Sequence, residues 1–156
     1  MPKIIELNDY HDLRLQKCFR RYFTEIGEHL RENTTVFERM QEAVTEQNMH
    51  CLVLMDEADI CGFLQFQTEE LTHSMGFFKE TVGFIREFWI SPEERGKGNG
   101  ARLLSAVEDH FRKEGVCKLI LTYEENALSF YEKQGFTIDR SYTAENEQGV
   151  VVKLLR

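Results

Sequence analysis

A strand, a glycine-rich turn and a helix follow one another in the middle of this chain, and a second strand follows the helix. The apolar run 84–90 is strand-like, and the segment 95–100, Arg-Gly-Lys-Gly-Asn-Gly, leads into an amphipathic helical pattern over 98–113. An apolar strand pattern returns at 116–122. Two strands of one sheet that are joined through a helix form a right-handed parallel crossover. The chain is therefore predicted to contain a parallel strand pair within its sheet.

The glycines of the segment 95–100 make it a candidate anion-binding site. Glycine lets the backbone approach a ligand closely, and the first amides of a helix attract anions because they have no partner within the helix. The spacing of Gly96, Gly98 and Gly100 is not that of GxGxxG, and no Lys-Ser or Lys-Thr follows as a Walker A loop requires. The segment predicts a phosphate site at the carboxyl end of strand 84–90.

Apolar periodicities along the rest of the chain predict the element order β-α-α-β-β-β-α-β-α-β-β. The expected strands are 3–7, 51–55, 60–67, 78–90, 116–122, 136–142 and 150–154, and the expected helices are 9–26, 35–46, 98–113 and 126–134. This order predicts an α/β fold of the α+β type, with a mixed sheet and helices on both faces. The length of 156 residues predicts a single domain, 1–156.

Four local expectations concern the first two helices and one loop. Asn8 or Asp9 is expected to cap the first helix. Its expected inner positions are Leu13, Phe19, Tyr22, Phe23 and Ile26. The stretch 68–76 is expected to be a loop in which His73 and Met75 could overhang a site. The second helix carries Glu38, Glu42 and Glu46 four residues apart, which indicates either a solvated face or an acidic wall beside a pocket for a cationic substrate.

Composition excludes several classes of partner. Lys and Arg number 19 against 27 Asp and Glu, and the net charge of −8 disfavours binding to nucleic acid or to an anionic membrane. No apolar run is long enough to cross a bilayer, and the N-terminus does not resemble a signal peptide. The four cysteines form no CxxC pair and are expected to be buried thiols, and the five histidines lack metal-ligand spacing. A cytoplasmic protein without a metal is expected.

Two motifs give the chain a family resemblance. Segment 95–100, preceded by Ile-Ser-Pro at 90–92, matches Gln/Arg-x-x-Gly-x-Gly/Ala. Segment 126–136 matches Asn-Ala-x-x-Phe-Tyr-Glu-x-x-Gly-Phe. Together they resemble the GNAT family, the Gcn5-related N-acetyltransferases. The resemblance covers 84–136, and the first 75 residues carry no motif.

The resemblance implies acetyl-CoA as the donor and a mostly antiparallel sheet whose parallel pair splays apart at the CoA site. The pyrophosphate would lie on the amides of Gly96, Gly98, Gly100 and Ala101, with positive charge from Arg95 and Lys97. The pantetheine would pair with the backbones of Phe88 and Ile90, and Asn126 could bond its amides. The other interpretation of Asn126 is a helix cap, and that of Lys97 is a solvated lysine.

The resemblance also implies catalytic roles. Tyr131 matches the general acid that protonates the departing thiolate, although a buried packing tyrosine would fit the same helix position. Glu87 is the candidate base, and the alternative is a strand-surface carboxylate. Phe84 stands where histone-modifying members have a glutamate, which argues against their arrangement. Arg86 could recognise a carboxylate on the acceptor, and Tyr123 and Glu124 are further pocket candidates.

The function expected from the resemblance is acetyl transfer from acetyl-CoA to a primary amine by direct attack on the thioester. A small-molecule amine is the expected acceptor. The alternatives are a protein N-terminal or lysine acetyltransferase and, in another class, a non-catalytic acyl-CoA-binding module. A monomer or a homodimer is expected. The sequence identifies neither the acceptor nor the range of acyl-CoA donors.

Overall fold

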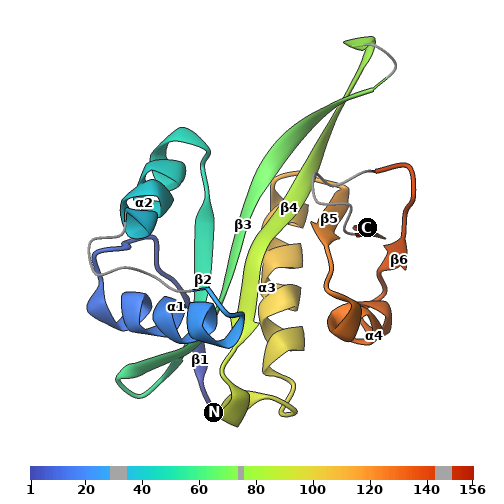
Figure 1. Cartoon of the computed structure of the whole chain (residues 1–156). Coiled ribbons are helices and arrows are strands. Elements are labelled where there is room, and N and C mark those ends of the chain that lie inside the picture. The colour runs from blue at the N-terminus through green and yellow to red at the C-terminus, as the bar shows by residue number, and fades with distance from the viewer. Residues whose placement is uncertain (29–34, 74–75, 143–148) are drawn as a thin grey trace. The chain divides into compact units, whose positions relative to one another are not determined.

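The computed structural model of the chain describes residues 1–28, 35–73, 76–142 and 149–156 (Figure 1). Its strands are β1 (Lys3–Glu6), β2 (His50–Asp56), β3 (Asp59–His73), β4 (Phe78–Ile90), β5 (Lys118–Thr122), β6 (Thr137–Ile138) and β7 (Val150–Leu154). Its helices are α1 (Leu13–Glu25), α2 (Val36–Glu46), α3 (Asn99–Lys113) and α4 (Leu128–Lys133), with two short 3-10 helices, η2 (Pro92–Glu94) and η3 (Glu125–Ala127). The strands and α-helices follow the predicted order.

The strands form one mixed sheet in the order β1-β2-β3-β4-β5-β7-β6. The pairs β1–β2, β2–β3, β5–β7 and β6–β7 are antiparallel, whereas β4 and β5 are parallel. The parallel register pairs Gly83 with Leu119 and Phe84 with Ile120, which is a short stretch of the 13-residue strand β4. The predicted sheet, mostly antiparallel with one parallel pair, is confirmed.

The chain divides into two compact units. The first comprises Met1–Gln67 and Glu87–Ser105, and the second comprises Thr68–Arg86 and Ala106–Arg156. Strands β3 and β4 and helix α3 each contribute residues to both units. The division cuts through elements of the predicted single domain, which stays a prediction.

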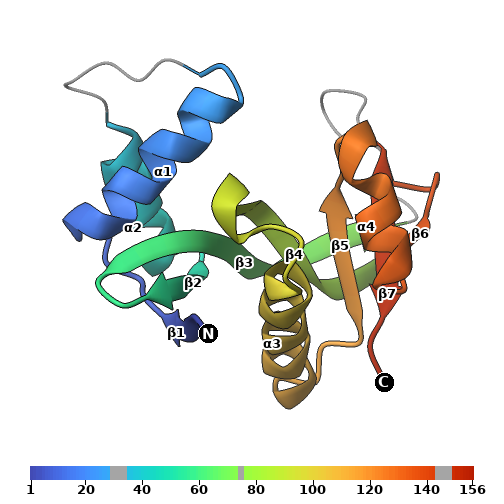
Figure 2. The same ribbon diagram turned by 90° about the horizontal axis from the view of Figure 1, so that it is seen from below.

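In the first unit, α1 and α2 pack on β2 and β3 through an aromatic core. The ring of Phe19 stacks on that of Phe63 with 3.9 Å between centroids, and both side chains are fully buried. Phe37 of α2 and Trp89 near the end of β4 belong to the same cluster. Figures 1 and 2 show both helices beside these strands. Burial of these large rings stabilises the packing of α1 on the sheet.

The predicted start of the first helix is wrong. Asp12 is the N-cap, because its carboxylate accepts hydrogen bonds from the backbone amides of Arg14 and Leu15. Asn8 instead accepts from the amide of Cys51, and Asp9 accepts from the amide of His11 in the turn before the helix. The inner face is also narrower than predicted, since Leu13 and Ile26 are 78% and 51% exposed.

The stretch 68–76 is not the predicted loop over most of its length, because β3 continues to His73. In the second unit, Leu71 packs against the cluster around Val82 and Ile120. Lys79 of β4 forms an ion pair with Glu70 of β3, with 3.4 Å between Nζ and Oε1. These contacts stabilise a strand whose polar sequence resembles that of a loop. The prediction for Met75, and that for the side chain of His73, lie outside the described residues.

The second unit also contains a close contact that requires glycine. A Cβ on Gly83 of β4 would lie 2.6 Å from the ring of Phe111 in α3, so only glycine fits there. On α3, the side chains of Leu103, Leu104, Val107 and Phe111 are buried, as the amphipathic pattern over 98–113 predicts. The parallel strand–helix–strand unit predicted from the sequence is therefore present, with its helix packed as expected.

The predicted strand 136–142 is reduced to the two residues of β6. A turn ends the strand early, because the Asp139 carboxylate accepts hydrogen bonds from the amide and the hydroxyl of Ser141.

The cysteines differ in burial. Cys18, Cys51 and Cys61 are buried as expected, but Cys117 is exposed in the connection before β5.

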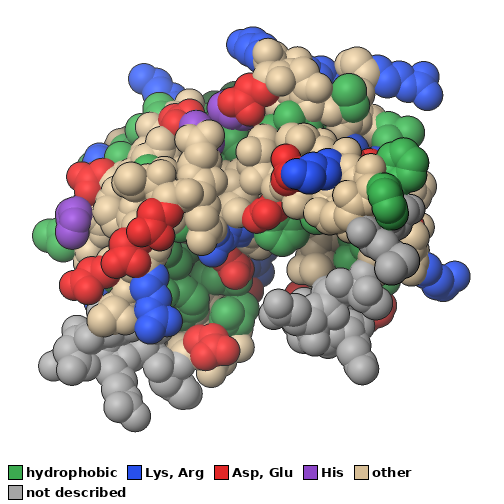
Figure 3. All heavy atoms as spheres, turned by 90° about the horizontal axis from the view of Figure 1, so that it is seen from above, with side chains coloured by type: hydrophobic (Ala, Val, Ile, Leu, Met, Phe, Trp, Pro, Cys, Tyr) green, Lys and Arg blue, Asp and Glu red, His purple; other side chains and the backbone are tan. Residues whose placement is uncertain are grey.

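In the part of the chain that the structure describes, no helix is long and apolar enough to cross a membrane. No group of His, Cys, Asp and Glu side chains among the same residues could hold a metal ion. On the face shown in Figure 3, acidic side chains are interspersed with basic ones.

Candidate functional site

The glycine segment has the backbone that an anion site requires. Gly96 and Gly98 have φ angles of +74° and +83°, a left-handed conformation that favours glycine. A Cβ at either position would meet nothing within 4 Å, so the space in front of the backbone is open. Gly100 lies in the first turn of α3. The segment therefore presents the start of a 15-residue helix to open space.

Two polar side chains hold this segment from the protein side. Asn99 is 3% exposed, and its Nδ2 donates to the carbonyl of Glu94 at 3.1 Å. Arg102 donates from Nη1 to Asn99 Oδ1 at 3.1 Å and from Nη2 to the carbonyl of Pro2 at 2.9 Å. Sequence reasoning missed both residues. An asparagine at a helix start is a residue type that bonds nearby backbone, which is the signal that could have identified it.

The two cations expected to face the phosphates are paired with carboxylates. Arg95 donates to both oxygens of Glu25, at 2.8 and 3.0 Å, and its Nε donates to the carbonyl of Ile90 at 2.8 Å. Lys97 lies 3.5 Å from Glu94. Because these charges are already compensated, the attraction for an anion at this loop comes mainly from the amides at the start of α3.

The end of β4 presents Glu87 toward α1. The hydroxyl of Tyr22 donates to the Glu87 carboxylate, and Trp89 Nε1 donates to Glu25 at 3.0 Å. Residues 87 and 89 point to the same face because side chains alternate along a strand. Phe88 and Ile90 point to the opposite face and are half-buried. Glu87, Phe88, Ile90 and 95–101 thus lie together in the first unit.

Asn126 and Tyr131 belong to the second unit. Tyr131 of α4 is 8% exposed, and its ring lies 5.3 Å from that of Phe130 and 5.7 Å from that of Phe136, between centroids. Asn126 is exposed within η3, and the N-cap position of α4 is occupied by Ala127, so Asn126 is not the cap.

The remaining candidates from the sequence also lie in the second unit. Tyr123 is buried with its ring against Gly149, and its amide donates to the Gly149 carbonyl at 3.1 Å. Glu124 and Arg86 are exposed. Tyr123 therefore packs the end of β5 against the start of β7.

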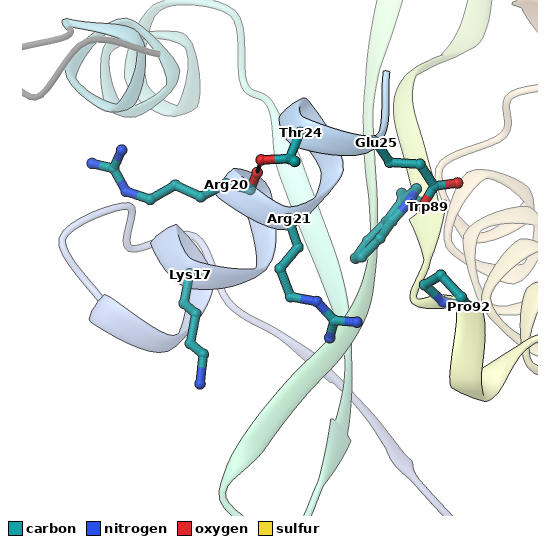
Figure 4. Close-up of a pocket in the computed structure, with 7 residues that line it drawn as sticks. All are labelled: Lys17, Arg20, Arg21, Thr24, Glu25, Trp89 and Pro92. Carbon is teal, nitrogen blue, oxygen red and sulfur yellow. Dashed lines mark hydrogen bonds between the residues drawn. The ribbon is translucent and has the colours of Figure 1, made fainter. Parts of the chain in front are cut away.

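Two open cavities lie in the first unit, and the sequence carried no motif for either. One of about 410 Å³ is lined by Lys17, Arg20, Arg21, Thr24, Glu25, Trp89 and Pro92 (Figure 4). The other, of about 400 Å³, is lined by His11, Glu38, Gln41, Glu42, Thr45 and Glu46. The three glutamates of α2 are exposed and line this open cavity, so both interpretations of their spacing stay predictions.

Ion pairs hold two carboxylates in the charged form: Glu25, which lines the first cavity, and Glu93, which pairs with the lining residue Arg21. The hydrogen bond from Arg21, 2.9 Å away, lowers the pKa of Glu93 to about 2. Burial acts to raise the pKa of Glu25, but hydrogen bonds from Arg95 and Trp89 outweigh it, and the net shift is downward. Both groups are therefore anionic at neutral pH.

Comparison with known proteins shows which family the sequence matches. The model of a family described as the acetyltransferase (GNAT) family matches residues 13–136. Glucosamine 6-phosphate N-acetyltransferase of Trypanosoma brucei brucei is 40% identical over 55 residues, which are 35% of this chain and 37% of that protein. The alignments span 37 and 60% of the lengths of the first two curated relatives.

Solved structures share the fold over the whole chain. A GNAT-family acetyltransferase from Staphylococcus aureus Mu50 superposes with a TM-score of 0.75 at 14% identity, covering 100% of both chains. PaiA N-acetyltransferase from Thermoplasma acidophilum, in complex with coenzyme A, gives a TM-score of 0.69 at 17% identity. It covers 97% of this chain and 99% of that protein. At these identities the similarity establishes the fold.

Proposed function

Because the chain belongs to the GNAT family of acetyltransferases, we propose that it transfers an acetyl group from acetyl-CoA to the primary amine of a small molecule. The observation that carries the proposal is the glycine segment, where Gly96 and Gly98 adopt left-handed conformations in front of the first turn of α3. That geometry suits the pyrophosphate of a CoA thioester.

In the proposed donor site, the amides of Gly96, Gly98, Gly100 and Ala101 hold the pyrophosphate. Phe88 and Ile90 offer backbone groups to the pantetheine, and Asn126 offers its exposed side-chain amide. Arg95 contributes less charge than its sequence position implies, because Glu25 already accepts two hydrogen bonds from it. Asn99 keeps the loop in place.

In the proposed reaction, the neutral amine attacks the thioester carbonyl carbon, a C–N bond forms and the C–S bond breaks. Glu87 accepts the proton that the amine nitrogen loses, and Tyr22 orients Glu87 through its hydrogen bond. Tyr131 donates a proton to the departing sulfur, so the products are the acetylated amine and CoA thiol. Solvent restores the proton on Tyr131 and removes the one on Glu87.

The test is transfer from acetyl-CoA to a panel of amines, followed by mass spectrometry of the acetylated product together with CoA release. The panel contains neutral, anionic and polycationic small amines, and peptides with a free N-terminus or a lysine. The proposal expects turnover with small amines. Acetylation of peptides alone would contradict the small-molecule acceptor. Binding of acetyl-CoA without transfer to any amine would contradict catalysis.

One feature of the chain affects the choice of assay. Cys117 is an exposed free thiol and reacts with colorimetric thiol reagents, which adds a background to CoA release. A blank that contains the protein without the amine corrects for it. The mass of the product is independent of this background.

A further inference from the structure

Helix α1 concentrates positive charge in an acidic protein. Its 13 residues hold four of the chain's 19 basic side chains, at positions 14, 17, 20 and 21, and one acidic side chain, Glu25. Three of the four basic residues line the 410 Å³ cavity, with Glu25 as its single acidic lining residue. The cavity therefore has a surplus of positive charge although the chain has a net charge of −8.

The cavity combines this charge with an apolar wall. Figure 4 shows Lys17 and Arg21 extending from α1 to the same side, with Trp89 and Pro92 across from Arg21. The Arg21 guanidinium lies 5.5 Å from the centroid of the Trp89 ring. Arg20 extends the other way and lies 5.3 Å from the Phe37 ring. An indole face beside cationic donors suits a ligand with a carbon skeleton and an anionic group.

The ion pairs of the cavity leave part of this charge uncompensated. Among the described residues they are Arg21 with Glu93 at 2.9 Å and Glu25 with Arg95 at 2.8 Å, and neither includes Lys17 or Arg20. The Arg21 side chain is itself 41% exposed, so an incoming anion can share its guanidinium with Glu93. Lys17 and Arg21 are thus the two donors available to an anion from this helix.

The cavity also lies next to the candidate base. Tyr22, which donates to Glu87, has its ring 6.2 Å from that of Trp89, and Trp89 lines the cavity. Glu87 and Trp89 are two residues apart on one face of β4. A small molecule with its anionic end at Lys17 and Arg21 can therefore direct an amine toward Glu87.

We propose that this cavity binds an anionic group of the acceptor, so that the substrate is an amine that also carries a phosphate or a carboxylate. The inference rests on the proposed function for the amine. The anion site itself depends only on residues of α1, β4 and η2. The phosphates of acetyl-CoA are the other source of the same chemistry, and the experiment separates the two.

The binding test uses Trp89, which is the single tryptophan of the chain and lines the cavity. Its fluorescence is followed while glucosamine 6-phosphate or glucosamine is added, and again with 4-aminobutyrate or its amide. The anionic member of at least one pair should bind about tenfold more tightly, or about 1.4 kcal/mol. Equal affinities within both pairs would overturn the proposal, whether or not any amine is acetylated.

Variants locate the binding. Lys17→Gln and Arg21→Gln should each weaken binding of the anionic member about three- to tenfold, since each removes a charged donor. Arg14→Gln is the matched control, because Arg14 lies on the same helix, is paired with Asp12 at 2.7 Å and does not line the cavity. An equal loss in all three variants would mean a general charge effect and would overturn the site.

Steady-state kinetics separates the acceptor from the donor. In the Lys17→Gln variant, the KM of the anionic acceptor should rise while the KM of acetyl-CoA stays unchanged. A rise in the KM of acetyl-CoA alone would assign the cavity to the CoA phosphates and overturn the proposal. Turnover with neutral amines that exceeds turnover with the anionic ones would overturn it while leaving the proposed acetyl transfer intact.

Discussion

At the scale of single residues, Tyr131 combines a packing role with a proposed chemical one. It is 8% exposed and lies between Phe130 and Phe136, so phenylalanine would fill its space. We expect Tyr131→Phe to keep the melting temperature and the affinity for acetyl-CoA while lowering kcat about 100-fold, the usual loss for a general acid. Thermal unfolding, acetyl-CoA titration and steady-state kinetics check these expectations. Unchanged turnover would remove Tyr131 from the mechanism.

Glu87, the proposed base, has a hydrogen-bond partner in the structure that the sequence does not indicate. Tyr22 donates to its carboxylate from a position 65 residues away. We expect Glu87→Gln to lower kcat/KM about 10- to 100-fold near neutral pH and to abolish the rise of kcat/KM on the acidic side. A pH–rate profile measures both effects.

The matched control for this prediction is Tyr22→Phe. It keeps the carboxylate but removes a hydrogen bond that stabilises the charged form, so the acidic rise should persist and move to higher pH. A Glu87→Gln enzyme with a normal pH profile would assign the base to another group.

At the scale of elements, a substitution in the glycine loop should have two separate effects, one on the stability of the fold and one on the affinity for acetyl-CoA. Gly98→Ala places a side chain at a φ of +83°, which costs about 1–2 kcal/mol of stability. Its Cβ would point into the open space proposed for the pyrophosphate, so the affinity for acetyl-CoA should fall as well, about tenfold. Urea unfolding and acetyl-CoA titration measure the two effects.

Gly115→Ala provides the control for that loop. Gly115 follows α3, has a φ of +76° and also has nothing within 4 Å of an added Cβ. Its substitution should reduce stability by a similar amount and leave acetyl-CoA affinity unchanged. Equal losses of affinity in both variants would show that the glycine loop has no special part in binding the donor.

The elements differ in how well sequence predicts them. Strand β4, the glycine loop and α3 were predicted closely, because Gly96, Gly98 and the apolar spacing of α3 act over short distances. The start of α1 was not, because Asn8, Asp9 and Asp12 are all residue types that cap helices. Asn8 is taken up by its tertiary contact with the Cys51 amide and Asp9 by the amide of His11, which leaves Asp12 as the cap. The extension of β3 depends on contacts from other elements, so its polar sequence gave no sign of it.

At the scale of the whole molecule, the proposed donor half of the candidate site can be read from the sequence and the proposed acceptor half cannot. The proposed donor half rests on two local motifs, 95–100 and 126–136. The basic cavity forms only when α1 meets the end of β4 and η2, and the ion pair between Arg21 of α1 and Glu93 of η2 joins residues that are 72 positions apart. The residues that line this cavity form no recognisable sequence motif, so the sequence does not indicate that they lie close together in the fold.

The same ion pairs predict how stability depends on pH across the molecule. Hydrogen bonds lower the pKa of Asp12 through Arg14, of Glu93 to about 2 through Arg21, and of Asp139 through Ser141, and those from Arg95 and Trp89 outweigh burial at Glu25. A carboxyl with a lowered pKa stabilises the fold above its ordinary pKa, and this contribution is lost as pH falls through the lowered value.

The free energy of unfolding should therefore decrease as the pH falls from about 4.5 to about 2. The ordinary pKa values of aspartate and glutamate set the upper limit of this range. Each contribution is small because these groups are largely solvated, so the decline should be gradual. Urea unfolding at pH 7, 4 and 3 measures it, and Glu93→Gln should flatten the lower part of the curve because the hydrogen bond from Arg21 lowers the pKa of Glu93 to about 2. A free energy of unfolding that rises from pH 4.5 to pH 3 would mean that these pairs do not stabilise the folded protein.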